Sequence, residues 1–241
     1  MSQAMTGTPP RERILYGRRQ GHRLRAARRD LLVGELPKYS IALPAAGSLD
    51  PADLFARPMT GYWLEVGFGN GEHLAEQAAQ HRDIGCIGCE PFINGVSMLV
   101  RHLVERDLPN VRIYADDARD LLDRLPEGVL GRVFVLFPDP WPKTRHHRRR
   151  FISTATLDSL ARAMGDGAEL RLATDHMDCG RWMLRHALAH PDFAWTAEGP
   201  ADWLQPPADD SPSRYQEKAL AAGRSCLYLQ FRRRPRPAAR K

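Results

Sequence analysis

Residues 64–74 read LEVGFGNGEHL, an apolar run that leads into three alternating glycines and then into a polar, helix-favouring segment. The apolar run predicts a buried strand. Gly67, Gly69 and Gly71 allow a tight turn in which the backbone closely approaches a ligand, and the start of the next helix offers unpaired N–H groups. Strand, glycine turn and helix in this order predict a binding loop for a nucleotide-like cofactor.

The acids around this loop narrow the choice of cofactor. In the dinucleotide pattern G-x-G-x-x-G, a pyrophosphate rests on the helix N-terminus, but Glu72 stands here in place of the third glycine. Glu65 lies two residues before Gly67, at the tip of the strand, where an acid can meet a cationic group. S-adenosylmethionine carries an ammonium and a sulfonium and no phosphate. The loop therefore favours S-adenosylmethionine over NAD.

Strand and helix patterns alternate outward from the loop. Strands are predicted at 62–67, 84–90, 111–116, 133–137, 168–174, 193–197 and 226–231, and helices at 71–81, 93–107, 118–125, 152–164 and 177–190. Such alternation predicts an α/β fold with a mostly parallel, seven-stranded sheet and helices on both faces. Ligands then bind at the carboxyl ends of the strands.

Further acids follow the second and third predicted strands. Glu90 ends the second strand, 23 residues after Gly67, where a carboxylate accepts hydrogen bonds from ribose hydroxyls. Asp116 and Asp117 end the third, where an adenine amino group would lie. One acid at a strand end is usually a helix cap. Three at successive strand ends, beside a glycine loop, favour a cofactor site.

A stiff acidic turn follows the fourth predicted strand, in the stretch LFPDPWPKTRHHRRRF, residues 136–151. Prolines fix φ and restrict the residue before them, so Asp139 is held between Pro138 and Pro140. Such preorganisation of one acid suits a reacting centre. The alternative is a simple turn, which explains the prolines but not Trp141 or the basic run that begins at Lys143. Those residues can stack on bases and bind phosphates.

Positive charge is concentrated in three runs. The net charge is +6 and the pI about 9.4, and 19 of the 35 lysines and arginines lie in the runs, eight at 11–29, five at 143–150 and six at 232–241. This pattern predicts a polyanionic partner, either nucleic acid or an acidic membrane surface. The domain prediction is a basic arm and linker at 1–58, a globular domain at 59–232 and a basic tail at 233–241. The arm shows no clear apolar period and is expected to order on binding.

Several classes are disfavoured by composition. No run approaches the roughly 18 apolar residues of a membrane span, and the N-terminus lacks a secretory signal, so we expect a cytoplasmic protein. Four cysteines are too few for a disulfide framework. Cys86 and Cys89 form a C-x-x-C, but it falls within a predicted buried strand and lacks a second ligand pair, so we expect no metal site. Monomer and homodimer both remain open.

Together, these motifs carry a resemblance to a known family. The chain resembles the bacterial tRNA (guanine-N7-)-methyltransferases, which act on guanosine 46 of the variable loop, from about residue 15 to residue 231. The similar stretches are LEVGFGNGEHL, GCEPFINGV, YADDA, LFPDPWPKTRHHRRRF, RLATD and PSRYQEK. The resemblance implies a class I methyltransferase fold of the Rossmann-like type, S-adenosylmethionine as cofactor and tRNA as substrate.

The resemblance also implies roles for individual residues. It implies cofactor contacts by Glu65, Glu90, Asp117 and Asp139 beside Gly67 and Gly69 of the loop. Our hypothesis for catalysis is that Asp139 orients cofactor and guanine and offsets the positive charge that grows on the purine. It implies substrate contacts by Lys143, Asp175 and the segment Ser213, Arg214, Tyr215 and Gln216. The family pattern at that segment is T-x-[FY]-E, so Gln216 replaces an acid. Either Glu217 takes that role through a shifted loop, or the contact is a neutral hydrogen bond.

Three other functions compete with this interpretation. A methyltransferase for an exocyclic amino group of adenine or cytosine also uses a short proline-aromatic loop. A non-catalytic RNA-binding protein could keep the same fold, and only the change at Gln216 favours it. An NAD-dependent dehydrogenase is weaker because of Glu72 and the lack of residues that would handle a hydride.

Overall fold

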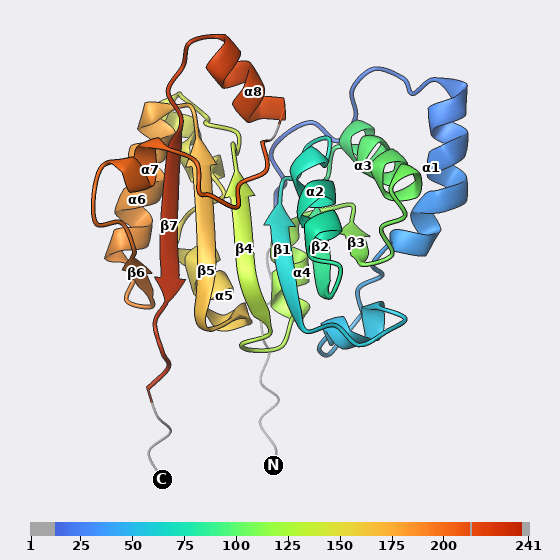
Figure 1. The fold of residues 1–241 in the computed structure, drawn as a ribbon, viewed down its shortest axis with the longest axis horizontal. Coiled ribbons are helices and arrows are strands. Elements are labelled where there is room, and N and C mark those ends of the chain that lie inside the picture. Colours follow the sequence, from blue (N-terminus) through green and yellow to red (C-terminus); the bar gives the residue numbers. More distant parts are fainter. Residues whose placement is uncertain (1–12, 213, 238–241) are drawn as a thin grey trace, which may run out of the picture.

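A seven-stranded sheet, ordered β3-β2-β1-β4-β5-β7-β6, lies at the centre of the computed structural model, which describes residues 13–212 and 214–237 (Figure 1). The strands are β1 (Gly61–Val66), β2 (Ile84–Cys89), β3 (Val111–Tyr114), β4 (Leu130–Leu136), β5 (Met164–Thr174), β6 (Phe193–Trp195) and β7 (Leu227–Arg233). The first five pair in parallel, whereas β7 runs antiparallel to both its neighbours. The predicted mostly parallel, seven-stranded sheet is confirmed.

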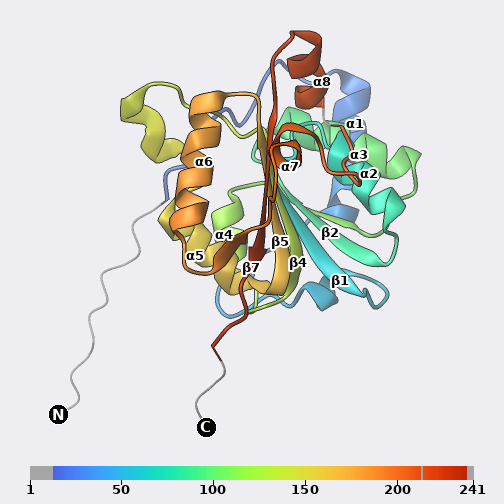
Figure 2. The ribbon, with the colours of Figure 1, turned by 60° about the vertical axis from the view of Figure 1, so that its left-hand side comes forward.

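Helices cover both faces of the sheet, as predicted. The α-helices are α1 (Ala26–Tyr39), α2 (Glu72–Gln80), α3 (Ile93–Glu105), α4 (Ala118–Arg124), α5 (Thr154–Ala163), α6 (Met177–Ala189), α7 (Ala201–Leu204) and α8 (Arg214–Ala221), and two 3-10 helices are η1 (Pro51–Leu54) and η2 (Thr144–Arg149). Figure 2 shows α4, α5 and α6 on one side of the sheet and α1, α2 and α3 on the other. Each layer buries its own apolar cluster against the strands.

The strand order places a crevice at the centre of one sheet edge. The chain winds outward from β1 through β2 to β3, then returns to the other side of β1 with β4 and β5. In an open α/β sheet, ligands bind at this reversal, beyond the carboxyl ends of the strands. Helix α8 lies above the same edge (Figure 1).

Three helices were not expected from the sequence. Helix α1 lies in the segment interpreted as an arm and linker, yet it buries Leu32 and packs with α3. Its arginines and Pro37 obscure the apolar positions that make this contact. Helices α7 and α8 lie in the Pro-rich segment between the last two strands, where only a loop was predicted. None of the described helices is long and apolar enough to cross a membrane.

Candidate active site

The glycine loop takes a backbone conformation that favours glycine. Gly67, Gly69 and Gly71 have φ angles of 73°, 57° and 82°, in the left-handed region that L side chains rarely adopt. At Gly71, a Cβ would also lie 2.7 Å from the side chain of Leu99 on α3. The loop therefore turns sharply after β1 and starts α2 at Gly71 with no side-chain cap.

The carboxylate of Glu90, just beyond β2, fixes this loop. One oxygen accepts a hydrogen bond of 2.9 Å from the Gly69 N–H, and the other accepts one of 2.9 Å from the Phe92 N–H. Burial raises the pKa of Glu90, and these two hydrogen bonds oppose the rise. A carboxylate has about four acceptor positions. Two of them therefore remain available to hydroxyl donors of a ligand.

Asp117 follows β3 and is held by Arg119. Its carboxylate caps α4 by accepting a 3.0 Å hydrogen bond from the Arg119 N–H, and it also pairs with the Arg119 guanidinium. Burial alone would raise the pKa of Asp117, but the hydrogen bonds from Arg119 outweigh burial and lower it. Asp117 is thus a charged carboxylate whose position is fixed before any ligand binds.

The turn that carries Asp139 leaves the end of β4 in an unusual backbone conformation. Phe137 and Trp141 have φ angles of 49° and 41°, and such angles are rare for bulky residues. The Phe137 N–H donates to the Ala173 carbonyl at 2.8 Å. Asp139 lines the cavity and keeps contact with solvent, but partial burial of its carboxylate raises its pKa. A strained turn therefore holds Asp139 at the edge of the sheet.

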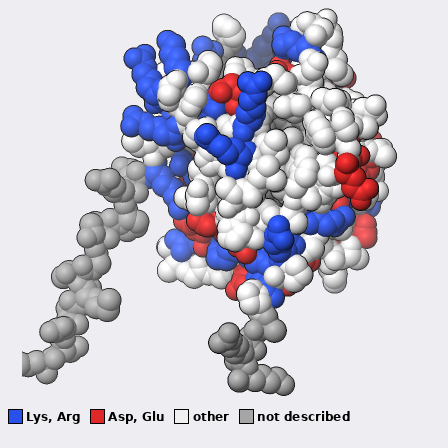
Figure 3. All heavy atoms as spheres, turned by 90° about the vertical axis from the view of Figure 1, so that its left-hand side faces the viewer, with Lys and Arg blue, Asp and Glu red and all other residues white. Residues whose placement is uncertain are grey.

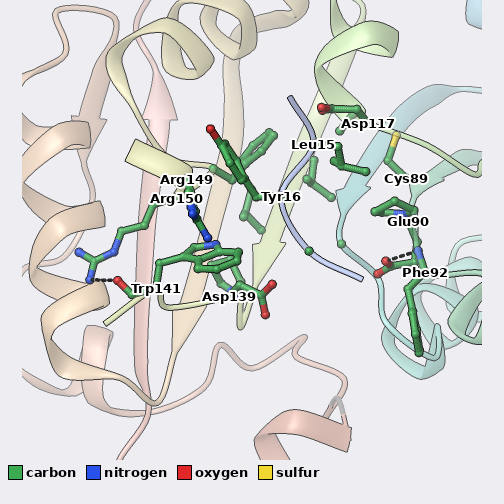
Figure 4. Close-up of a pocket in the computed structure, with 18 of the residues that line it drawn as sticks. Leu15, Tyr16, Cys89, Glu90, Phe92, Asp117, Asp139, Trp141, Arg149 and Arg150 are labelled. Atoms are coloured by element: carbon green, nitrogen blue, oxygen red, sulfur yellow. Dashed lines mark hydrogen bonds between the residues drawn. The ribbon is translucent and has the colours of Figure 1, made fainter. Parts of the chain in front are cut away.

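These groups line one open cavity of about 890 Å³. Figure 4 shows Asp139, Trp141 and Arg149 on one side of it and Glu90, Phe92 and Asp117 on the other, with the segment that carries Leu15 and Tyr16 passing between them. Arg149 lies over the rings of both Tyr16 and Trp141, at 4.7 and 4.9 Å from their centroids. One wall is thus acidic and backbone-rich, and the other is aromatic and basic.

Comparison with known proteins matches this arrangement to a family. Residues 60–229 match a family model described as "Putative methyltransferase". A tRNA (guanine-N(7)-)-methyltransferase of Rhodospirillum rubrum is 51% identical, covering 97% of this chain and 93% of its own. One of Paramagnetospirillum magneticum is 48% identical, covering 92% and 93%. This chain belongs to the tRNA (guanine-N(7)-)-methyltransferase family.

Solved structures support the fold of this family member. An rRNA methylase of Streptococcus thermophilus superposes with a TM-score of 0.51 at 10% identity, covering 77% of this chain and 92% of its own. TrmN of Thermus thermophilus gives 0.51 at 14% identity, covering 76% and 47%. At these identities the likeness concerns the fold alone, which is that of the class I S-adenosylmethionine-dependent methyltransferases.

The residues present fit the cofactor that this family uses. A Cβ at Gly67 would meet no atom within 4 Å, so the backbone of the glycine loop borders open space there. Glu90 keeps free acceptor positions beside it. The acids near this loop suit a cationic, phosphate-free ligand. S-adenosylmethionine is compatible with this wall of the cavity.

The cavity brings together some of the residues that the sequence singled out and not others. Gly67, Gly69, Glu90, Asp117, Asp139 and Tyr215 line it. Glu65 does not, because its carboxylate is buried beneath the loop, 2.7 Å from His73 Nδ1. A phenylalanine, Phe134, packs edge-on against the same histidine.

The remaining substrate-binding candidates that the structure describes are not among the residues that line the cavity. Lys143 is exposed at the start of η2, and Arg214 is exposed at the start of α8. Asp175 pairs with Arg224 at 2.8 Å. Gln216 is buried and donates a 2.9 Å hydrogen bond to Asp210. Glu217 is exposed, and Ser213 lies outside the described residues.

The sequence analysis missed the contribution of residues 15–18 to the cavity. The Ile93 N–H donates to the Arg19 carbonyl at 3.0 Å, and Arg19 pairs with Asp116 at 2.8 Å, so this segment is attached to the cavity rim. The signal was the apolar pair Leu15–Tyr16 inside an arginine-rich stretch. Isolated apolar residues among charges show no periodicity, so the sequence pattern does not predict that this segment packs against the folded domain.

Proposed function

We propose that this family member transfers a methyl group from S-adenosylmethionine to N7 of guanosine 46 in the variable loop of tRNA. We also propose that the reaction takes place in the cytoplasm, where tRNA is found. The observation that carries the proposal is that a single cavity is lined by Asp139 on one side and by Gly69 and Glu90 on the other. The likeness of residues 136–151 to the family supports position 46.

The reaction needs alignment more than proton transfer. Guanine N7 has a free lone pair and no proton to lose, so no residue of the site must act as a general base. Holding the two reactants in a near-attack geometry can supply several kcal/mol. Asp139 would orient the purine, and its negative charge would offset the positive charge that grows on the ring as the N7 lone pair bonds the methyl carbon and that carbon leaves the sulfonium sulfur.

The cofactor wall would consist of Gly67, Gly69, Glu90 and Asp117. Glu90 would accept hydrogen bonds from ribose hydroxyls, while Asp117 would lie near the adenine. When bound, S-adenosylmethionine supplies an electrophilic methyl group on a sulfonium. Glu65 would act on this wall indirectly, since it contacts His73 beneath the loop.

The tRNA would lie across the basic face that includes η2. Lys143, Arg145 and Arg148 are exposed there, and Figure 3 shows lysines and arginines gathered at the upper left of this side of the molecule. Asp175 and residues 213–216 are proposed to contact the target nucleotide and its neighbours. Tyr215 supports this, because it lines the cavity next to Gly69.

One experiment tests the proposed function. The protein is incubated with labelled S-adenosylmethionine and unmodified tRNA, and the digested nucleosides are then identified. We expect 7-methylguanosine, and we expect none in a tRNA whose guanosine 46 is replaced by adenosine. Label on adenosine or cytidine would instead support the exocyclic-amine reaction. Cofactor binding without transfer to any tRNA would support a non-catalytic RNA-binding protein.

The proposed binding of tRNA to the basic face leads to a separate prediction. Because each neutralised phosphate releases counterions, the logarithm of tRNA affinity should fall linearly and steeply with the logarithm of salt concentration. Changing Lys143 and Arg145 together to methionine should reduce that slope by roughly 1 to 2. Filter binding without cofactor, from 50 to 300 mM KCl, measures this slope. If the tRNA affinity of the unchanged protein did not depend on salt concentration, this basic face would not be the tRNA-binding surface.

A further inference from the structure

The strained turn that carries Asp139 is held by one buried arginine, Arg150, at the border of the cavity. Arg150 Nε donates to the Pro140 carbonyl at 2.8 Å, and Arg150 Nη2 donates to the Trp141 carbonyl at 3.5 Å. These two carbonyls directly follow Asp139 in the chain. The side chain of Arg150 is only 2% exposed, so its charge is not available to bind a phosphate in solvent.

Arg150 is in turn fixed by helix α6. Its Nη2 pairs with the carboxylate of Asp178, and its guanidinium lies 5.2 Å from the centroid of the Trp182 ring. Trp182 is itself attached, because its indole N–H donates to the Ile152 carbonyl at 2.7 Å. Charge-assisted hydrogen bonds and a cation–π contact thus tie the turn to a rigid helix.

The two ends of the turn explain why such a tie is needed. Phe137 and Trp141 both have positive φ angles, and bulky residues keep such strained angles only where the surrounding structure enforces them. The Phe137 end is enforced by its bond to Ala173 in the sheet. At the Trp141 end, the Trp141 carbonyl is held by Arg150. Without that contact, the turn can relax and carry Asp139 with it.

The guanidinium also points away from the reacting groups. Figure 4 shows Arg150 extending to the side of the turn opposite Asp139, with its hydrogen bond to the turn drawn dashed. Its neighbour Arg149 has a different environment, over the rings of Tyr16 and Trp141. The basic run 143–150 therefore contains members with separate tasks.

We propose that Arg150, anchored by Asp178 and Trp182, is a positioning residue that holds the Pro138–Trp141 turn so that Asp139 faces the bound purine. The proposal rests on the proposed function, since it assigns a support to that same site. Arg150 acts through the turn, because its guanidinium is bonded to the turn carbonyls and to Asp178.

The test compares Arg150→Met with Arg145→Met, which removes the same charge from an exposed member of the run. Arg150→Met should lower kcat on the order of 100-fold, as expected for a misplaced reacting group, with the dissociation constant for S-adenosylmethionine unchanged. Arg145→Met should mainly raise the KM for tRNA. Arg150→Lys should recover only part of kcat, because one ammonium cannot bond both carbonyls and Asp178 in the same planar geometry.

Two readouts separate positioning from general damage. Amide hydrogen exchange over residues 137–143 should accelerate in Arg150→Met and not in Arg145→Met, and this readout needs no activity. The acid limb of kcat should also move to lower pH in Arg150→Met, because a released Asp139 loses the surroundings that raise its pKa. A role in stability alone would accelerate exchange throughout the sheet rather than over this turn, and it would leave the acid limb in place.

The outcomes are distinguishable. If the unchanged protein transfers no methyl group to guanine N7, the proposed function fails. If it does and Arg150→Met keeps kcat within twofold and normal exchange of the turn, only the positioning role is overturned. Should Arg150→Met fail to fold, Asp178→Asn decides, because Asp178 is 54% exposed and its loss is tolerable. Asp178→Asn should lower kcat and accelerate exchange of the turn, both by less than Arg150→Met does. Unchanged kcat and unchanged exchange in this variant would overturn the proposal.

Discussion

The two walls of the cavity are built by different means. The cofactor wall consists of backbone and strand ends, with Gly69 and Phe92 bonded to Glu90 at 2.9 Å. The opposite wall depends on side chains that reach across the fold, as Arg150 reaches Asp178 on α6. A wall of the first kind is rigid once the sheet forms. One of the second kind can fail through the loss of a single side chain far from the chemistry.

This difference separates the effects of substitutions. A change in the cofactor wall should weaken cofactor binding, because the loop and Glu90 contact the ligand in its ground state. A change in the turn at Asp139 should reduce turnover with little effect on cofactor binding. Ground-state binding and transition-state stabilisation then appear in different kinetic constants.

The largest expected effect is that of Asp139→Asn. The substitution keeps the size of the side chain and removes the charge that offsets the cationic purine. We expect kcat to fall by about 100-fold, a loss typical of removing one preorganised electrostatic group. Single-turnover methylation of tRNA with saturating cofactor measures it. The dissociation constant for S-adenosylmethionine serves as the control and should stay within about twofold.

Near-normal turnover in Asp139→Asn, with unchanged cofactor affinity, would falsify the electrostatic role of this acid. A loss of cofactor affinity equal to the loss of turnover would instead assign Asp139 to the cofactor wall. Either result would remove the contrast between the two walls.

The second effect is that of Glu90→Gln. A glutamine keeps one acceptor oxygen, so it cannot bond the N–H groups of Gly69 and Phe92 together and still receive a ribose hydroxyl. Hydrogen bonds to a charged group contribute about 1.5–3 kcal/mol, so the cofactor dissociation constant should rise roughly 10- to 100-fold. Isothermal titration measures it.

Glu72→Gln is the matched control for Glu90→Gln. It makes the same chemical change at the first residue of α2, and Glu72 is not among the residues that line the cavity. It should leave cofactor affinity unchanged. Equal losses in both variants would mean that net charge, rather than the Glu90 contacts, sets the affinity.

The same contrast explains what the sequence could and could not predict. The glycine loop, Glu90 and Asp139 follow strand ends directly, so local pattern and the geometry of parallel sheets locate them. Arg150 and Asp178 are 28 positions apart in the chain. No local signal pairs them. Arg150 therefore looked like one more phosphate ligand, although it is buried.

Helix α1 shows a related limit. Its apolar contacts come from Leu31, Leu32 and Leu36, packed against the cluster that includes α3. Its sequence alone predicts little amphipathic character, because Arg28 and Arg29 precede this part of the helix and Pro37 falls in the last turn. The partner surface on α3, and not the helix sequence, selects this structure. Propensity is a weak guide where tertiary packing decides.

The smallest expected effect concerns Glu65, which the resemblance assigns to the cofactor and which lies beneath the loop in the structure. Burial alone would lower the pKa of His73, but the adjacent Glu65 carboxylate outweighs burial and raises this pKa above the ordinary histidine value of 6.5. Asp210 adds to this rise, and Arg171 opposes it. The pair 2.7 Å apart is therefore an ion pair while His73 is protonated.

A histidine whose pKa is higher in the folded state stabilises the fold fully below about pH 6.5, and this contribution is lost as pH rises through the folded-state pKa. The melting temperature of the unchanged protein should therefore fall by a few degrees over that range. In Glu65→Gln this pH dependence should flatten, whereas His22→Gln, at an exposed histidine, should retain it. Calorimetry from pH 5.5 to 8.5 provides the comparison. Cofactor affinity should drop less in Glu65→Gln than in Glu90→Gln, and the reverse order would return Glu65 to direct contact with the cofactor.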